Sequence, residues 1–366
     1  MKRLLTMLLL AAMLLMPLTG ASAEEAPETV HVGFVCWGYS DLLSTQYVRY
    51  LDYLAENMNL EITYATAYSS EEHVATTENL ISAGVDVILD YDCYAAMMEL
   101  CENAGVYLAQ YSLEISSPEL KETLEGYSHW LGYSVCDDYE SGCYMAKAMY
   151  DQGCRNIALL AIAPGSAAAD LRWNGVVDTV AQYDDYNIIA EYRNDDTGEF
   201  GPALSNMIAL YGNLDGVILM GSSDGAYDAV IQTLEIEGLI GEIKFATVDV
   251  DENSRVDMER GALHVIGGGQ FIDPGMLLIP VYNAVTGSPM TDGPFTLYGK
   301  NIFIEGPEDF DIYETYIEGD VFPYTFEELK PYLRMYNPEA TFEDFAEFYD
   351  QYSLDEVVTR HADLVG

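Results

Sequence analysis

The stretch GVILMGSSD at residues 216–224 has the pattern that decides the fold of this chain. An unbroken apolar run leads into a turn of small residues and then into Asp224. A strand that is apolar on both faces is typical of a parallel sheet covered by helices on both sides. The stretch DVILDYD at residues 86–92 repeats this pattern roughly 130 residues earlier, with Asp92 after the strand. We interpret the repeat as two similar lobes, each built on a buried strand.

Outward from these two stretches, strand-like runs alternate with amphipathic segments of helical length. This alternation, repeated nine or ten times, predicts an α/β protein with parallel sheets. The predicted strands lie at residues 31–36, 60–64, 85–90, 106–110, 131–135, 156–161, 186–192, 216–220, 243–248 and 263–267. The predicted helices lie at residues 42–57, 71–82, 94–104, 138–150, 167–183, 202–211, 226–237, 254–260 and 274–285.

The first 23 residues have the pattern of a secretory signal peptide. Lys2 and Arg3 precede an apolar run over residues 4–16, and the small residues 21–23 form a cleavage site. The run is too short to span a bilayer. No cysteine precedes Cys36, so the lipid-attachment form of such a signal is not indicated. We expect an exported protein, periplasmic or in the cell envelope, that is not lipid-anchored.

The composition excludes several classes of function. The 366 residues include 61 acidic and 15 basic side chains, a formal net charge of −46, which disfavours binding to nucleic acid or to anionic membranes. The length predicts two domains, and 50% hydrophobic residues suffice for their cores. The six cysteines show no CxxC pair and the five histidines are scattered, so we expect no metal site and no cofactor.

One catalytic motif is present. Residues 221–225 match the G-x-S-x-G turn of hydrolases, with Ser223 as the nucleophile. A hydrolase also needs a later histidine, and neither His264 nor His361 lies in a recognisable loop after a strand. We therefore keep a Ser223 hydrolase only as a weaker alternative and expect no enzyme.

Polar and aromatic residues follow many of the predicted strands, at the edge where open α/β sheets bind ligands. Carboxylates, amides and a guanidinium are planar partners for hydroxyl groups, and aromatic rings offer flat apolar faces to a sugar. No pair of these groups suggests turnover, so the set indicates capture of a ligand. The candidate ligand-binding residues are Trp37, Tyr39, Asp92, Gln110, Tyr111, Arg172, Asp224, Asp249, Asp251 and Gln270.

Two longer motifs carry a family resemblance. The run LGYSVCDDYESG at residues 131–142 is similar to a G-x-D-N-x-x-x-G segment, and GSAAADLRWNG at residues 165–175 is similar to a stretch whose arginine binds sugar. Asp224, Asp251 and Gln270 follow in the matching order. Over roughly residues 30–304 the chain resembles the type I periplasmic binding proteins of the ribose-binding kind, relatives of the lac-repressor ligand domain.

The chain departs from that family at three places. CWGY at residues 36–39 replaces a motif that often contains Asn-Pro and two aromatic residues, and Gln110-Tyr111 replaces a common Asp-Arg pair. Asp249 stands where the family usually has glycine, so either Asp249 or Asp251 faces the ligand.

The resemblance implies two Rossmann-like lobes joined by a three-segment hinge. It assigns residues 24–132 and 271–303 to the N-terminal lobe and residues 133–270 to the C-terminal lobe, with crossings near residues 111–132, 249–272 and 298–305. Residues 304–366 form an acidic, aromatic, helical extension whose aromatic stripe (Phe342, Phe345, Tyr349 and Tyr352) we expect to pack inward.

The implied function is capture of a monosaccharide or similar polyol by hinge closure. The expected partner is the permease of an ABC importer, and the expected state is a monomer. The alternative from the same fold is a sensor that presents its closed form to a membrane receptor or kinase.

Overall fold

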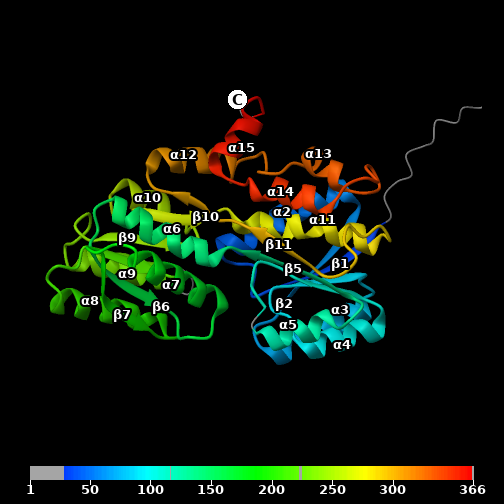
Figure 1. Cartoon of the computed structure of the whole chain (residues 1–366), viewed down its shortest axis with the longest axis horizontal. Helices are drawn as coiled ribbons and strands as arrows, with labels where there is room; N and C mark the ends of the chain where they lie inside the picture. The colour runs from blue at the N-terminus through cyan, green and yellow to red at the C-terminus, as the bar shows by residue number, and fades with distance from the viewer. Residues whose placement is uncertain (1–28, 116, 222–224, 365–366) are drawn as a thin grey trace, which may run out of the picture.

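A computed structural model describes residues 29–115, 117–221 and 225–364. It contains two six-stranded sheets, one in each lobe (Figure 1). The N-terminal sheet has the order β11-β5-β4-β3-β1-β2, and all its strand pairs are parallel. Its strands are β1 (Val30–Cys36), β2 (Leu60–Thr66), β3 (Val87–Asp90), β4 (Tyr107–Gln110), β5 (Trp130–Cys136) and β11 (Phe295–Gly299).

The C-terminal sheet has the order β12-β10-β9-β8-β6-β7, and only the β10–β12 pair among these strands is antiparallel. The two lobes therefore repeat one architecture, as the repeated sequence pattern predicts. The strands are β6 (Asn156–Ala161), β7 (Asn187–Arg193), β8 (Gly216–Leu219), β9 (Lys244–Val248), β10 (Val265–Gly268) and β12 (Ile302–Ile304).

Helices cover both sheets, and their ends follow local sequence signals. In α3, for example, Ser69 and Glu72 form a capping box, and Gly84 ends the helix with a φ of 86°. The helices of the lobes are α2 (Leu42–Met58), α3 (Ser70–Ala83), α4 (Ala95–Ala104), α5 (Pro118–Glu125), α6 (Asp138–Asp151), α7 (Ala167–Val180), α8 (Phe200–Leu210), α9 (Ala226–Ile236), α10 (Ser254–Glu259) and α11 (Asp273–Val285), with 3₁₀ turns η1 (Thr197–Glu199) and η2 (Gln270–Ile272).

The predicted α/β class with two lobes is confirmed, and each of the ten predicted strands ends within two residues of its observed ends. The strands β11 and β12 and the helix α5 were not predicted. β12 has only three residues and pairs with β10 about 35 residues away, so its strand character comes from the partner strand rather than from its own sequence.

The lobe boundaries differ from the predicted ones at two places. β5 pairs with β4 and β11 along its whole length, so the boundary predicted after residue 132 falls inside a strand, and the first crossing follows Cys136 rather than lying near residues 111–132. β12 pairs with β10 and so belongs to the C-terminal sheet, although residues 302 and 303 were assigned to the N-terminal lobe. The other two crossings lie between β10 and α11 and between β11 and β12.

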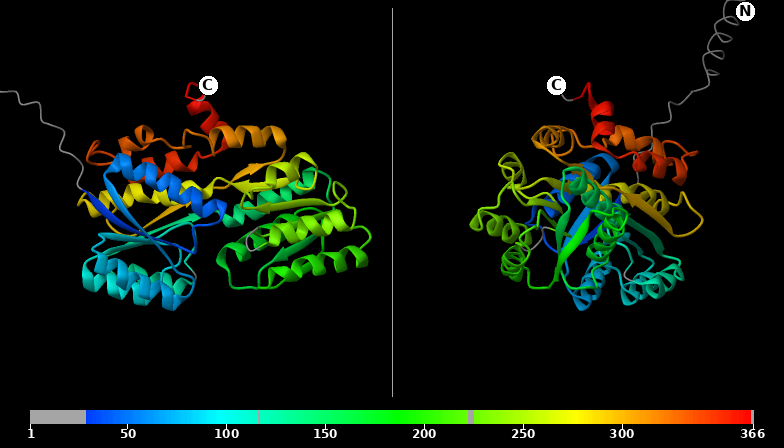
Figure 2. Two further views of the ribbon diagram at one scale, coloured as in Figure 1. Left: turned by 180° about the vertical axis from the view of Figure 1, so that it is seen from behind. Right: turned by 60° about the vertical axis from the view of Figure 1, so that its left-hand side comes forward.

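The C-terminal extension, residues 305–364, forms a helical layer that runs across both lobes (Figure 2). As expected, its aromatic stripe packs inward, because Phe345, Tyr349 and Tyr352 are buried and Phe342 packs against the same core. No helix in the described residues has the length and apolar character needed to cross a membrane. The layer consists of α12 (Pro307–Tyr316), α13 (Phe326–Leu329), η3 (Lys330–Tyr332), α14 (Phe342–Asp350) and α15 (Leu354–His361).

Candidate functional site

Four side chains of the C-terminal lobe and its hinge converge at the carboxyl ends of the strands, and we call them the polar cluster. Asp138 begins α6, Arg172 lies in the second turn of α7, Asp249 follows β9 and Gln270 follows β10. The Arg172 Nε donates to Asp138 Oδ1 at 2.7 Å, and its Nη1 donates to the carbonyl of Met220 at 2.8 Å. The Gln270 Nε2 donates to Asp249 Oδ1 at 2.7 Å.

The two pairs of the polar cluster meet beside Gly221. A Cβ atom at Gly221 would lie 3.5 Å from Arg172 Nη1 and 3.8 Å from Asp249 Oδ2. The charge of Asp249 also contributes to raising the pKa of the Arg172 guanidinium. The polar cluster therefore brings together three predicted residues, Arg172, Asp249 and Gln270, and one that was not predicted, Asp138.

Two glycines place Arg172 in this cluster. A Cβ at Gly142 of α6 would overlap the backbone oxygen of Arg172, and a Cβ at Gly175 of α7 would overlap the backbone oxygen of Tyr139. The backbones of α6 and α7 therefore touch directly, which only glycine permits. This contact brings the start of α7 close enough for Arg172 to reach Asp138. Both glycines lie in the two motifs that carry the family resemblance.

Burial sets the electrostatics of the Arg172–Asp138 pair. The side chain of Asp138 is 2% exposed and that of Arg172 is 12% exposed. Burial raises the pKa of Asp138, and the neighbouring Arg172 opposes that rise. Burial alone would lower the pKa of Arg172, but Asp138 and Asp249 raise it above its ordinary value. The guanidinium is therefore charged, paired with Asp138 and influenced by the nearby charge of Asp249.

The backbone conformation at Asp249 is the kind that glycine adopts most easily. Asp249 has a φ of 70°, in the left-handed region that favours glycine, and the resembling family usually has glycine there. A non-glycine residue pays about 1–2 kcal/mol for this conformation. Of the two alternatives, Asp249 joins the polar cluster. The Asp251 carboxylate instead accepts from the backbone of Asn253, in the turn before α10.

The N-terminal lobe presents different chemistry, which we call the aromatic edge: Trp37, Tyr91, Asp92 and Tyr94. Trp37 is half-buried after β1, and its ring meets that of Tyr91 edge-to-face at 5.4 Å between centroids. Asp92 follows β3, and its carboxylate accepts from the hydroxyl of Tyr94. Beneath this edge, His73 and Asp90 form a fully buried pair with Nδ1 to Oδ1 at 2.9 Å.

Three predicted ligand residues are bonded to the backbone instead. The Tyr39 hydroxyl donates to the carbonyls of Phe34 and Ala65. The Gln110 amide accepts from Cys93 N and donates to the Leu113 carbonyl. Tyr111 is completely buried, and its hydroxyl donates to the Val35 carbonyl at 2.8 Å.

We therefore correct the assignments of Gln110 and Tyr111, because buried polar groups take hydrogen bonds from the nearest backbone and these two serve the interior. Tyr39 likewise fastens β1 to β2. Asp224, with Ser223 of the alternative hydrolase motif, lies outside the described residues.

Sequence reasoning missed Asp138 and the His73–Asp90 pair. A signal for Asp138 was present, because two acids follow β5 and only one is needed to cap a helix. Asp137 caps α6 by accepting from Glu140 N, which leaves Asp138 to turn toward Arg172. The His73–Asp90 pair joins α3 to β3 across 17 residues and has no local motif.

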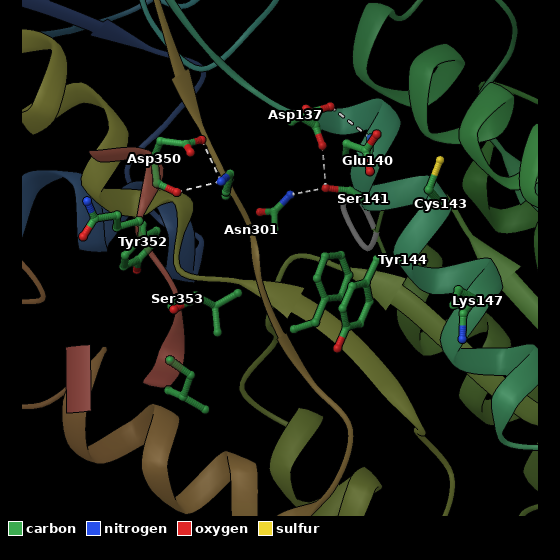
Figure 3. Close-up of a pocket in the computed structure, with 15 residues that line it drawn as sticks. Asp137, Glu140, Ser141, Cys143, Tyr144, Lys147, Asn301, Asp350, Tyr352 and Ser353 are labelled. Atoms are coloured by element: carbon green, nitrogen blue, oxygen red, sulfur yellow. Dashed lines mark hydrogen bonds and ion pairs between the residues drawn. The ribbon is translucent and has the colours of Figure 1, made fainter. Parts of the chain in front are cut away.

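A cavity of about 850 Å³ lies beside α6, and none of the four residues of the polar cluster lines it (Figure 3). Its walls come from α6, from residues 300–303 and from residues 350–354 of the extension. Asp137 lines this cavity whereas Asp138 faces Arg172, so two adjacent acids serve two different places. The cavity is therefore separate from the polar cluster.

The described residues contain no group of three or more His, Cys, Asp and Glu side chains arranged to hold a metal ion. The six cysteines are free thiols, and only Cys143 among them is partly exposed. Burial raises the pKa of Cys136, which lies between the two lobes at the end of β5. These thiols are therefore protonated and packed, in keeping with small buried side chains.

The comparison with protein families decides the classification. A family model described as a periplasmic binding protein domain matches residues 50–273. The chain belongs to this family. No protein of curated function matches its sequence. The family is one of binding proteins rather than enzymes, and its name places its members in the periplasm.

Solved structures of the same fold agree with this classification. A solute-binding protein of an ABC transporter from Actinobacillus succinogenes, with bound D-allose, is 17% identical with a TM-score of 0.67, and the match covers 76% of this chain and 98% of that one. An arabinose-binding component from Shewanella sp. ANA-3 is 16% identical with a TM-score of 0.67, covering 79% and 96%. A protein from Bacillus halodurans with bound myo-inositol is 17% identical with a TM-score of 0.64, covering 79% and 98%. Such neighbours are matched almost completely, while about a fifth to a quarter of this chain has no counterpart in them.

Proposed function

We propose that this chain is an extracytoplasmic solute-binding protein that captures a monosaccharide or similar polyol between its lobes and delivers it to the permease of an ABC importer. The observation that carries the proposal is the polar cluster, in which Arg172 pairs with Asp138 and Gln270 pairs with Asp249 at the carboxyl ends of the strands. Solved neighbours with bound allose and inositol support the ligand class. We further propose that the protein works as a monomer and is not lipid-anchored.

The charges favour an uncharged ligand. The polar cluster has one guanidinium and two carboxylates, so it has no spare positive charge for a phosphate or a carboxylate. Carboxylate and amide oxygens accept hydrogen bonds from hydroxyl groups, and the remaining guanidinium N–H groups can donate to ring and hydroxyl oxygens. Trp37 and Tyr91 of the aromatic edge offer apolar faces for the C–H side of a sugar ring. An acidic sugar, by contrast, meets repulsion from Asp138 and Asp249.

Capture follows from rotation of the lobes about the three crossings. A ligand that contacts both lobes binds the closed form better than the open form, so it shifts the population toward closure. The permease then distinguishes the loaded closed form from the empty one. The residues proposed for contact are Trp37, Asp92, Arg172, Asp224, Asp249 and Gln270.

The test is a thermal-shift screen of neutral sugars, polyols, uronic acids and amino acids, followed by titration calorimetry. A neutral sugar at about 100 times its Kd should stabilise the protein by about 2.7 kcal/mol. Arg172→Ala should weaken binding of that sugar at least about thirtyfold, because it removes a buried charged hydrogen-bonding group. The matched control is Arg193→Ala, whose guanidinium pairs with Asp170 elsewhere in the same lobe. A screen in which only acidic ligands stabilise the protein would contradict the proposal.

A further inference from the structure

The second part of the extension, residues 318–352, is fastened to the N-terminal lobe. The Gln46 Nε2 donates to Glu318 Oε1 at 2.6 Å, and the buried Tyr50 hydroxyl donates to the Tyr324 carbonyl at 3.0 Å. Asn283 of α11 donates to the Tyr332 carbonyl at 2.9 Å. These contacts involve α2 and α11, which both pack in the N-terminal lobe.

The first part of the extension, residues 305–317, is fastened to the C-terminal lobe. α12 packs against α10 and β12, and Arg255 of α10 forms ion pairs with both Asp311 and Glu314 of α12. The Tyr144 hydroxyl of α6 donates to Glu305 at 2.7 Å. After residue 317 the chain therefore passes from the C-terminal lobe to the N-terminal lobe once more.

The extension also contacts the hinge, and its last helix, α15, packs on its first helix, α12. The Tyr349 hydroxyl donates to Asp273 at 3.1 Å, and the Tyr352 hydroxyl donates to the Gly269 carbonyl at 2.9 Å, both in the second crossing. In the third crossing, Lys300 pairs with Asp350 at 2.7 Å. α15 then packs on α12 and lies between α12 and α13 in the layer (Figure 1).

We propose that the extension, residues 305–364, is a fourth connection between the lobes that restrains how far they open. The three crossings of the hinge are short, and such a hinge permits rotation through a few backbone angles. The extension holds both lobes at once, so opening has to break its contacts with one of them. The half-exposed ion pairs of Arg255 are weaker than the buried aromatic contacts of the extension, which include Phe310 and Tyr313 of α12, because solvent and salt screen the ion pairs. We therefore expect the ion pairs of Arg255 with Asp311 and Glu314 to break first when the lobes open.

The cavity in Figure 3 fits this arrangement. It separates α6 of the C-terminal lobe from residues 350–354 of the extension, which are bound to the hinge and the N-terminal lobe. Across it, Asn301 Nδ2 of the third crossing donates to Ser141 Oγ at 2.9 Å. The two walls of the cavity therefore belong to parts that change their separation when the lobes rotate.

The test measures the distance between the lobes in the full-length, ligand-free protein. Nitroxide labels are attached to an unnatural amino acid at the exposed positions Glu78 of α3 and Gln232 of α9, since the native cysteines preclude thiol labelling. Arg255→Gln should widen the distance distribution from pulsed electron resonance at least about 1.5-fold, because more open conformations become populated. High salt should widen the wild-type distribution in the same direction.

The matched control is Arg260→Gln, at the end of the same helix α10. Arg260 pairs with Asp257 and Glu235, which both belong to the C-terminal lobe, so this variant should leave the distribution unchanged. Equal distributions for wild type and Arg255→Gln at low salt would overturn the proposal, and so would equal widening by the two variants. The result does not depend on which ligand the cleft binds, so failure of the sugar screen leaves this test intact.

Discussion

The two lobes share one strand order but present different chemistry at the carboxyl ends of their parallel strands. In the C-terminal lobe the polar cluster is locked by mutual hydrogen bonds, with Arg172 paired to Asp138 and Gln270 paired to Asp249. In the N-terminal lobe the aromatic edge consists of rings in edge-to-face contact, with Trp37 half-buried against Tyr91. The difference shows that one strand order can present hydrogen-bonding groups with fixed directions in one lobe and the apolar faces of aromatic rings in the other.

One histidine in each lobe shows a further difference between the lobes. His73 of the N-terminal lobe has Asp90 as a partner, and both side chains are buried. His264 of the C-terminal lobe lies near the cation Lys244 instead, and burial together with this neighbour lowers the pKa of His264 to about 4. The N-terminal lobe therefore pairs its buried histidine with a carboxylate, whereas the C-terminal lobe keeps its histidine neutral.

The largest expected effect comes from breaking the locked pair. Arg172→Gln leaves Asp138 buried without a cation and should lower the free energy of unfolding by about 3–5 kcal/mol. Urea unfolding at pH 7 measures this loss. Lys147→Gln, which removes an exposed pair with Asp151 in α6, should cost less than about 1 kcal/mol. Similar losses in both variants would show that the polar cluster is no more rigid than the surface.

The second largest effect is expected at the close contact between Gly142 of α6 and the backbone of Arg172 in α7. Gly142→Ala forces α6 and α7 apart, because the added Cβ meets the Arg172 backbone, and should destabilise the protein by about 1–3 kcal/mol. It should also weaken sugar binding, since Arg172 moves with its helix. The control is Gly293→Ala, where a Cβ meets nothing within 4 Å. A Gly142→Ala protein with unchanged thermal stability would refute the close contact.

A smaller effect is expected at the aromatic edge. Trp37→Phe keeps an aromatic ring but loses the Nε1 hydrogen bond to Asp41, so we expect about 1 kcal/mol of lost stability. It should abolish most of the ligand-induced change in tryptophan emission, because Trp130 is buried in the N-terminal core and Trp173 lies against Arg193. Emission spectra with and without the identified sugar measure this. A change that survives in Trp37→Phe would assign the signal to Trp173 and so to the C-terminal lobe.

The last prediction concerns the dependence of stability on pH. The folded His264 has a pKa of about 4, whereas the unfolded side chain titrates near 6.5, so between these values only the unfolded chain takes up the proton. The contribution of His264 to stability is therefore complete above pH 6.5 and is lost as the pH falls toward 4. Buried carboxyl groups with a raised pKa, such as Asp138 and Asp90, act in the opposite direction.

Because these opposing contributions are both present in the wild type, the effect of His264 is measured by comparing the wild type with a variant that lacks this histidine. His264→Gln should lose less stability than wild type between pH 7 and pH 4.5 in urea titrations. Parallel curves for His264→Gln and wild type would mean that His264 is protonated in the folded state.

Much of the fold could be predicted from the local sequence pattern, whereas the candidate site could be predicted only in part. The strands β3 and β8 are continuous apolar runs, so their burial and parallel pairing were predictable. Arg172, Asp249 and Gln270 were predicted and do converge, because each follows a strand or its loop. Gln110 ends β4 and Tyr111 follows it, yet their side chains turn inward. The position of a residue in a strand–loop pattern does not fix the direction of its side chain.

The sequence by itself determined the α/β class, the repeat of two lobes, the ends of most elements and the family. These depend on the spacing of apolar residues and on capping groups a few residues apart. Only the tertiary structure decided that Asp138 rather than Gln110 joins Arg172, that β12 belongs to the C-terminal sheet, and that the extension holds both lobes. The physical reason is distance along the chain. A contact such as Arg255 to Glu314 joins residues 59 apart and forms only when separate elements have packed, so no local pattern records it.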